Sequence, residues 1–379
     1  MNAGRLHAVL ELVKQDYEKN ETAGKLQAAI DALTTSIATP NESNAVAFRD
    51  ALANLYAALD QSPLNSATPS QVEILKEIGA VDKVGSGLRS EIENTLNDNT
   101  VTPANALAEL QRIGQVVVNF GKIVEQIVNG FDELKIPYED LEPGESEVGV
   151  LIPWPVIHRD LEGLQKSLRE YDRALKTFGE LAEDNAESPI IKSVGSSALQ
   201  LFIQSTPAIA LCIATAIERL CALYKQILEI KILRKKISEQ SLPESVASTI
   251  EAHEKTVAES GIDKIVEDLV KEFGKQRPKE RLNELRNALR TGLRFLAQQI
   301  DAGVDLEVRA EPPRPKDVAE DAGQPVKSEK AKRALETARK TTARIQRAGA
   351  AMRTLDRTGD PILALDFGEK GKKSGSSEA

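Results

Sequence analysis

The side chains that most often act as metal ligands or general bases are scarce in this chain, which has three histidines and two cysteines. His253-Glu254 begins like the His-Glu-x-x-His signature of zinc proteases, but position 257 is valine, so the second zinc ligand is missing. His7 and His158 lie in two other predicted helices, and we expect all three histidines on helix surfaces. The sequence therefore predicts no metal site.

The cysteines Cys212 and Cys221 could supply a nucleophile or a disulfide. They are nine residues apart in one predicted helix. That spacing places them on opposite faces, so they cannot bridge each other within it. Cys212 lies in the most apolar stretch of the chain, where the pKa of a thiol rises and its reactivity falls. We predict two buried, small apolar side chains and a reducing, cytoplasmic compartment.

Nucleotide-binding signatures are also missing. Gly85-Ser86-Gly87 starts like a dinucleotide fingerprint, but Ser90 stands where the third glycine belongs, and no predicted strand precedes it. The 58 acidic residues form many close pairs, as solvated helix faces do, and no pair stands out. We predict no catalytic residue, no cofactor and no small-molecule substrate. The chain is expected not to be an enzyme, the alternative being a site assembled from scattered polar residues.

A basic segment near the C-terminus is the clearest candidate for binding. Residues 327–357 hold ten lysines and arginines against three acidic residues, although the whole chain has a formal charge of −9. A helix over these residues would present its charge to an acidic face of its own body, an acidic protein, an anionic membrane or a nucleic acid. The alternative is a loosely docked, solvated helix without a partner. Nucleic acid is less favoured, because no aromatic side chain accompanies the charge to stack on bases. The predicted partner-binding residues here are Lys330, Lys332, Arg333, Arg339, Lys340, Arg344 and Arg347.

Two apolar features are further candidates for partner contacts. Residues 361–367 form an apolar island in a polar tail, and Leu363, Leu365 and Phe367 are typical of a peptide that docks in a groove or on a sheet edge. The alternative is that the island folds back onto the body. Trp154 is the only tryptophan. It would either hold the start of the helix that follows it or serve as an exposed anchor for a partner.

The elements that would carry these residues are predicted to be helices. Aromatic residues make up only 4% of the chain, and residues that favour helices dominate. Short amphipathic helices are predicted over the first hundred residues. Two longer helices follow, with apolar residues spaced alternately by three and four from Leu110 to Leu134 and from Ile157 to Phe178. Because one loop joins them, we expect an antiparallel, coiled-coil-like pair.

Two short segments predict β structure. Residues 148–153 are too short and too apolar for a helix, whereas 303–309 alternate apolar and polar residues as a half-exposed strand does. We expect them to pair into one small two-stranded element, which survives only by packing on something else. The fold class is otherwise all-α, an elongated helical bundle.

The 25 residues 193–217 carry no charge. We expect them to belong largely to a helix over about 197–238, with Pro207 as a kink or as its true start. Their length would span a bilayer, but Gln200 and Gln204 would be costly in lipid. The favoured interpretation is a central helix buried by its neighbours. The alternative is a segment that is released into a membrane.

These patterns predict five regions. They are short helices over 1–100, the long-helix bundle over 101–310, a flexible linker over 311–327, a basic helix over 328–358 and a mostly disordered tail over 359–379. We expect a cytoplasmic interaction or scaffold protein, with a protein partner or self-association most favoured. The alternative is a membrane-active, pore-forming-like effector that uses 193–217 and associates with membranes peripherally or conditionally.

Overall fold

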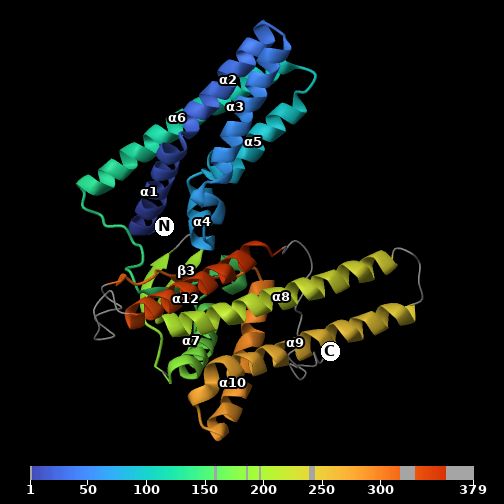
Figure 1. The fold of residues 1–379 in the computed structure, drawn as a ribbon. Coiled ribbons are helices and arrows are strands. Elements are labelled where there is room, and N and C mark those ends of the chain that lie inside the picture. Colours follow the sequence, from blue (N-terminus) through green and yellow to red (C-terminus); the bar gives the residue numbers. More distant parts are fainter. Residues whose placement is uncertain are drawn as a thin grey trace, which may run out of the picture. The chain divides into compact units, whose positions relative to one another are not determined.

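The computed structural model describes residues 2–157, 160–184, 187–195, 198–238, 244–315 and 329–355. Within them the chain is mostly helical, with one small sheet (Figure 1). It forms two compact units. One comprises the described residues of Met1–Asp140 and Val194–Ser197, and the other comprises those of Leu141–Ser193 and Ala198–Ala379.

The first unit contains the short helices that were predicted over the first hundred residues, although the fourth begins one residue before Ser70, the residue that the sequence suggested as its cap. Asn2 caps the first helix, and Thr68 and Gln71 form a capping box at the fourth. The helices are α1 (Ala3–Asn20), α2 (Thr22–Ala38), α3 (Glu42–Asp60), α4 (Pro69–Glu77), α5 (Gly85–Asp98) and α6 (Pro103–Glu133), with the short turns η1 (Pro63–Ser66) and η2 (Val81–Lys83).

The coiled-coil character expected of α6 is not confirmed. Ile127 and Leu134, predicted to belong to the seam, are 39% and 72% exposed. A straight α-helix drifts from a seven-residue repeat by about 20° per heptad, so the buried stripe passes from Ile127 to its neighbour Val128. The buried apolar residues from the second turn onward are Leu110, Ile113, Val117, Val124 and Val128.

The predicted antiparallel pairing of the two long helices was wrong. α6 packs against α1, α2 and α5 in the first unit, whereas α7 (Leu161–Glu183) packs against other helices in the second. The loop between the two helices contains the strand predicted there, but the helix that follows it packs in a different core.

A four-stranded antiparallel sheet with the strand order β2-β3-β1-β4 belongs to the second unit except for the last two residues of β2. β1 (Ser146–Ile152) pairs with β3 (Leu199–Ser205) on one side and with β4 (Asp305–Ala310) on the other, so that Val148 lies opposite both Ile203 and Val308. The predicted pairing of 148–153 with 303–309 is therefore confirmed. The sheet is larger than predicted, because β2 (Ile191–Gly195) and β3 were not expected.

β3 occupies residues that were predicted to be helical. The strand is buried over Leu199–Ile203, so it is rich in apolar residues without strict alternation, and periodicity alone cannot distinguish such a strand from a buried helix. The helix begins instead at Pro207, a residue favoured in the first helical turn, and α8 runs from Pro207 to Ser238. Of the two roles expected for Pro207, it marks the true start.

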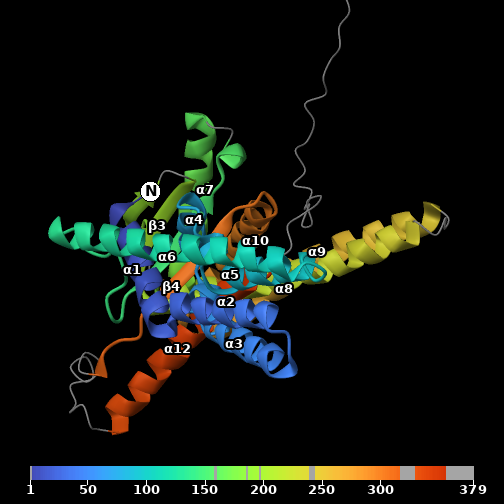
Figure 2. The same ribbon diagram turned by 90° about the horizontal axis from the view of Figure 1, so that it is seen from above.

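One apolar core joins the sheet to the helices of the second unit. Val148, Val150 and Ile152 of β1 face this core, which also includes residues of α7, α8 and α12. α8 and α9 run side by side as an arm that extends past the other helices of the unit (Figures 1 and 2). The remaining elements are η3 (Trp154–Ile157), α9 (Glu244–Phe273), η4 (Gly274–Gln276), α10 (Lys279–Asp301) and α12 (Glu329–Arg353).

Candidate interaction surfaces

Four of the five cysteines and histidines lie in the part of the chain that the structure describes, and His158 lies outside it. Cys212 and Cys221 are buried, and burial raises the pKa of the Cys212 thiol far above its usual value. His7, expected on a surface, is also buried: its Nδ1 lies 2.8 Å from the Ile136 carbonyl oxygen. His253 is exposed, as expected. Over the described residues, no group of three or more His, Cys, Asp or Glu side chains is placed to hold a metal.

The basic helix α12 is docked on the body through an apolar stripe. Ile345, Ala348 and Met352 are at most 2% exposed and belong to the main core. The Sδ atom of Met352 lies 3.3 Å from the Sγ atom of Cys221 in α8. The same helix packs against β4. Its large apolar residues are few, but alanines complete the stripe because they allow close approach.

Polar contacts fix the orientation of α12 about its axis. One carboxylate, that of Glu272 in α9, accepts a hydrogen bond from Arg344 of α12 at 2.8 Å and another from Arg219 of α8 at 3.2 Å. Near the other end of the contact, Lys225 of α8 donates to the Thr354 hydroxyl at 2.9 Å. Three helices therefore meet at Glu272.

The opposite face of α12 is exposed and strongly basic. It includes five of the residues predicted to bind a partner and one more, Arg353, which the prediction omitted. Lys340 pairs with Glu336 within the helix at 2.7 Å. Arg344 does not belong to this surface because Glu272 holds it, and Lys330 lies at the start of the helix. The basic face consists of Lys332, Arg333, Arg339, Lys340, Arg347 and Arg353.

The apolar candidates have different outcomes. Trp154 is half-buried in η3 and packs against the main core, and both roles expected for it stay predictions. Leu363, Leu365 and Phe367 lie outside the described residues, as does most of the predicted linker 311–327, and the expectations for them stay predictions.

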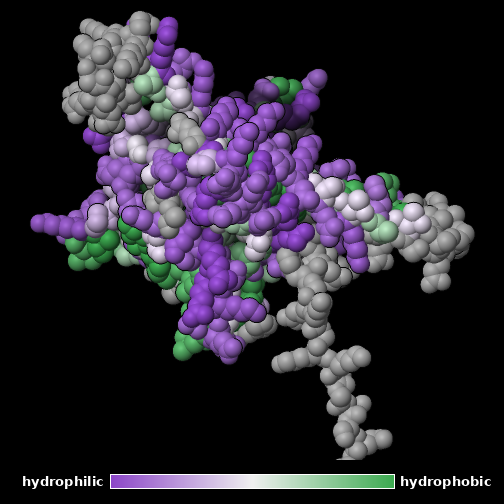
Figure 3. Space-filling model, turned by 90° about the horizontal axis from the view of Figure 1, so that it is seen from below, coloured by the Kyte–Doolittle hydropathy of each residue, from purple (hydrophilic) through white to green (hydrophobic). Residues whose placement is uncertain are grey.

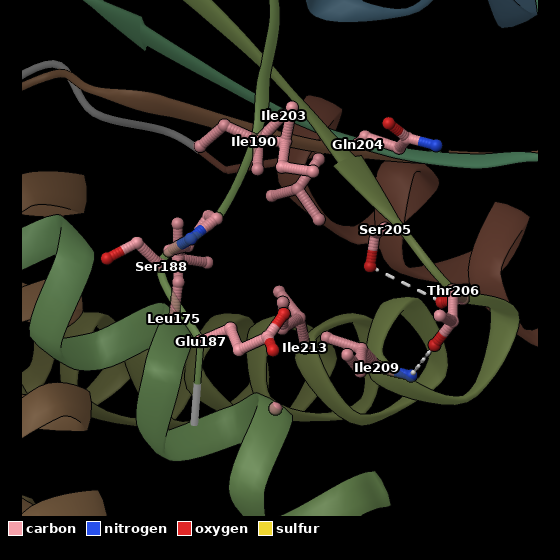
Figure 4. A pocket seen from close by; sticks show the side chains of 13 residues that line it. Leu175, Glu187, Ser188, Ile190, Ile203, Gln204, Ser205, Thr206, Ile209 and Ile213 are labelled. Carbon is pink, nitrogen blue, oxygen red and sulfur yellow. Dashed lines mark hydrogen bonds between the residues drawn. The ribbon is translucent and has the colours of Figure 1, made fainter. Parts of the chain in front are cut away.

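The sequence did not predict a pocket of about 230 Å³ that lies between the sheet and helices α7 and α8. Figure 4 shows Ile190 and Ile203 toward the sheet and Ile209 and Ile213 on α8. The Thr206 hydroxyl caps α8 by accepting from the backbone N–H of Ile209 at 3.3 Å. The other lining residues are Val148, Leu175, Gly179, Glu187, Ser188, Pro189, Gln204 and Ser205.

The lining of this pocket is better suited to holding an apolar group than to catalysing a reaction. Glu187 is its one charged lining residue, and the Ser205 hydroxyl donates to the Thr206 carbonyl at 3.3 Å. No histidine or cysteine is among the lining residues, so the lining lacks the serine–histidine pair that commonly activates a hydroxyl nucleophile. The pocket can accept an aliphatic or aromatic side chain.

The uncharged segment 193–217 is divided between strands and the start of α8. Cys212, Ala214 and Ile217 point to different sides of α8 and are at most 1% exposed, which agrees with a core helix. By length and composition Pro207–Leu233 could span a membrane, but 61% of its most apolar window is buried. Ile232 and Leu233, near the end of the arm, are 45% and 57% exposed. Figure 3 shows apolar residues among hydrophilic ones along this arm.

Comparison of the chain with protein-family models, with curated proteins and with solved structures gave no match, so the surfaces described above are the available guide to its function.

Proposed function

We propose that this protein is a helical interaction protein that binds an acidic partner protein through the basic face of α12. The observation that carries the proposal is the division of this helix into two faces. Ile345 and Met352 hold one face in the core, and the other leaves six lysines and arginines exposed. A helix whose role was only to cover the core would not need this excess of one charge.

The spacing of the charges suits a partner helix. Lys332, Arg339 and Arg347 follow one another at seven and eight residues, so they lie along one side of α12 about 11 Å apart. Acidic side chains two turns apart on a second helix would match this spacing. The face carries no aromatic side chain, which supports a protein partner over single-stranded nucleic acid.

The experiment compares defined polyanions. Binding of the full chain to a polyglutamate peptide, duplex DNA and phosphatidylserine vesicles is measured at low and physiological salt. A double variant, R339Q/R347Q, is expected to weaken polyglutamate binding about tenfold, which corresponds to about 1.4 kcal/mol for two charges. The matched control is K166Q/R169Q, which neutralises two exposed basic residues on α7. Equal losses in both variants, or tighter binding of DNA or vesicles than of polyglutamate, would contradict the proposal.

A second candidate function is peripheral association with an anionic membrane through the end of the arm. The exposed Ile232 and Leu233 are followed by the exposed Lys235 and Lys236. Apolar residues beside lysines are the combination that favours the interface of an anionic bilayer. The membrane-contacting element is then the far end of α8 and not the segment 193–217. That segment forms part of β2, all of β3 and the buried start of α8.

Vesicle co-sedimentation separates this candidate from the first. The I232S/L233S variant should lose most of its binding to phosphatidylserine vesicles, whereas V101S, which changes an apolar residue that is 90% exposed, should not. If vesicle binding survives in I232S/L233S but is lost in R339Q/R347Q, the membrane-contacting element is α12 and not the end of the arm.

A further inference from the structure

The two edges of the sheet differ in how they are covered. β4 forms one edge; it is mostly buried and lies against α12. β2 forms the other edge, and apolar side chains on it and just before it are exposed: Ile190 by 66%, Ile191 by 55% and Val194 by 53%. Because successive side chains of a strand alternate, these residues lie on both sides of β2.

An edge strand of this kind is unusual in a folded protein. Proteins commonly protect sheet edges with charged side chains or with a covering element, since an exposed apolar edge recruits other strands. The one lysine of β2, Lys192, has its ammonium group 2.9 Å from a carboxylate oxygen of Glu145, so it is held in an ion pair. The edge is therefore suited to receive an additional strand.

The pocket lies at the start of this edge. The backbone N–H of Gln204 donates to the Ile190 carbonyl at 2.9 Å. On the side of this bond away from β2, residues 187–189 and 205–206 line the opening between the sheet and α8 (Figure 4). A buried apolar cavity of about 150 Å³ accepts benzene, so the pocket of about 230 Å³ has room for a phenyl ring.

We infer that the edge of β2 and this pocket bind residues 361–367 of the same chain as an added strand. The side chains of Leu363, Leu365 and Phe367 alternate with Ile362, Ala364 and Asp366, which is the pattern of a strand with one wholly apolar side. Pro361 stands at the first position, where a strand tolerates proline. The segment thus offers what the edge lacks, namely backbone partners and apolar cover.

The length of chain permits Phe367 to reach the pocket. The described part of the C-terminal region ends at Leu355, next to Thr354, which bonds to Lys225 of α8. Lys225 lies sixteen residues along α8 from the pocket residue Ile209, a distance of about 24 Å. The twelve residues from 356 to Phe367 can extend about 40 Å. With Phe367 in the pocket, the segment would run antiparallel to β2, since the pocket lies at the N-terminal end of that strand.

The inference does not depend on the basic face of α12, and it is tested in the full chain by photo-cross-linking. A photoreactive benzoylphenylalanine replaces Ile191, and the cross-linked peptides are identified by mass spectrometry. The expected product joins position 191 to residues 361–367. The L363S/L365S/F367S variant should abolish it, and a photoreactive group at Val101 should not form it. The inference would be overturned if position 191 were cross-linked to other residues and the triple variant gave these products with undiminished yield.

Two further measurements complete the test. In an equal mixture of ¹⁵N-labelled and unlabelled chains, the two peptides of a cross-linked pair should be both labelled or both unlabelled, because the segment is bound by its own chain. Pairs of one labelled and one unlabelled peptide would refute that. Amide hydrogen exchange of residues 191–195 should be about tenfold faster in the triple serine variant than in the natural chain. The matched control, S374A/S376A/S377A, changes three residues of the same tail and should leave this exchange unaltered.

Discussion

The thioether sulfur of Met352 lies 3.3 Å from the thiol sulfur of Cys221. This contact joins the last turn of α12 to the middle of α8, across 131 residues of sequence. Both side chains are at most 2% exposed. The basic helix is therefore part of the core of the second unit, and its charged face is held in one orientation by packing on the other side.

Replacing Met352 with alanine should destabilise the second unit. The substitution removes three buried heavy atoms from a close-packed contact, and losses of about 2–4 kcal/mol are usual for such changes. Chemical denaturation measures the effect. Met352→Leu conserves most of the volume and should cost less than about 1.5 kcal/mol. Equal stability of the alanine variant and the natural chain would mean that α12 does not contribute to the cooperative core.

Glu272→Gln should loosen α12 without unfolding the unit. The carboxylate accepts from Arg344 and Arg219, and all three side chains are about a third exposed or more, so solvent limits the loss to about 1 kcal/mol. We expect faster amide exchange in α12 and a smaller difference at high salt. Glu280→Gln, at an exposed position of α10, is the control. Unchanged exchange in α12 would show that the apolar stripe alone sets its position.

The helices of the first unit could be predicted from sequence because their signals are local. Asn2, Thr68 and Gln71 act within one turn of the helices that they cap. The pairing of β1 with β4 was also predicted, since both segments have patterns that a helix does not fit. The basic residues of α12 were identified from their charge. The sequence did not show that one of them, Arg344, is held by Glu272, which is 72 positions away.

The rest of the fold required information that the local pattern does not contain. β3 is buried over most of its length, so its side chains do not show the strict polar alternation of a half-exposed strand. The pocket depends on Ile190, Thr206 and Leu175 meeting in space, and none of these residues is distinctive in sequence. The exposed edge of β2 could not be identified before its strand order was known.

Low pH should weaken the attachment of β2. The hydrogen bond from Lys192 and, to a lesser degree, the backbone N–H of Glu142 lower the pKa of Glu145 below its usual value of 4.5. A lowered pKa means that the pair contributes fully above pH 4.5 and is lost as the pH falls through the folded-state value. Because Glu145 is 39% exposed, the contribution is less than about 1 kcal/mol.

Hydrogen exchange measures this pH dependence. After correction for intrinsic rates, the amides of β2 should exchange faster at pH 3 than at pH 6 in the natural chain. Glu145→Gln should exchange at the faster rate at both values, because its side chain does not titrate. A pH effect of the same size in the Gln variant would assign the change to other carboxyl groups.

Gly87→Ala should destabilise the first unit strongly, although Gly87 looks from the sequence like part of a nucleotide fingerprint. A Cβ atom at this position would lie 1.8 Å from the carbonyl oxygen of Val81, a backbone atom that cannot rotate away. Relieving the overlap requires α5 to move from the preceding turn η2, and overpacking of this kind costs about 1–3 kcal/mol or more. Gly130→Ala on α6, where a Cβ would meet nothing within 4 Å, should instead be neutral or stabilise the helix by up to about 1 kcal/mol. Thermal denaturation of the two variants decides the matter. Similar melting temperatures of the two variants would mean that α5 can move away from η2 at little cost in free energy. The overlap at Val81 would then not be the reason for a glycine at position 87.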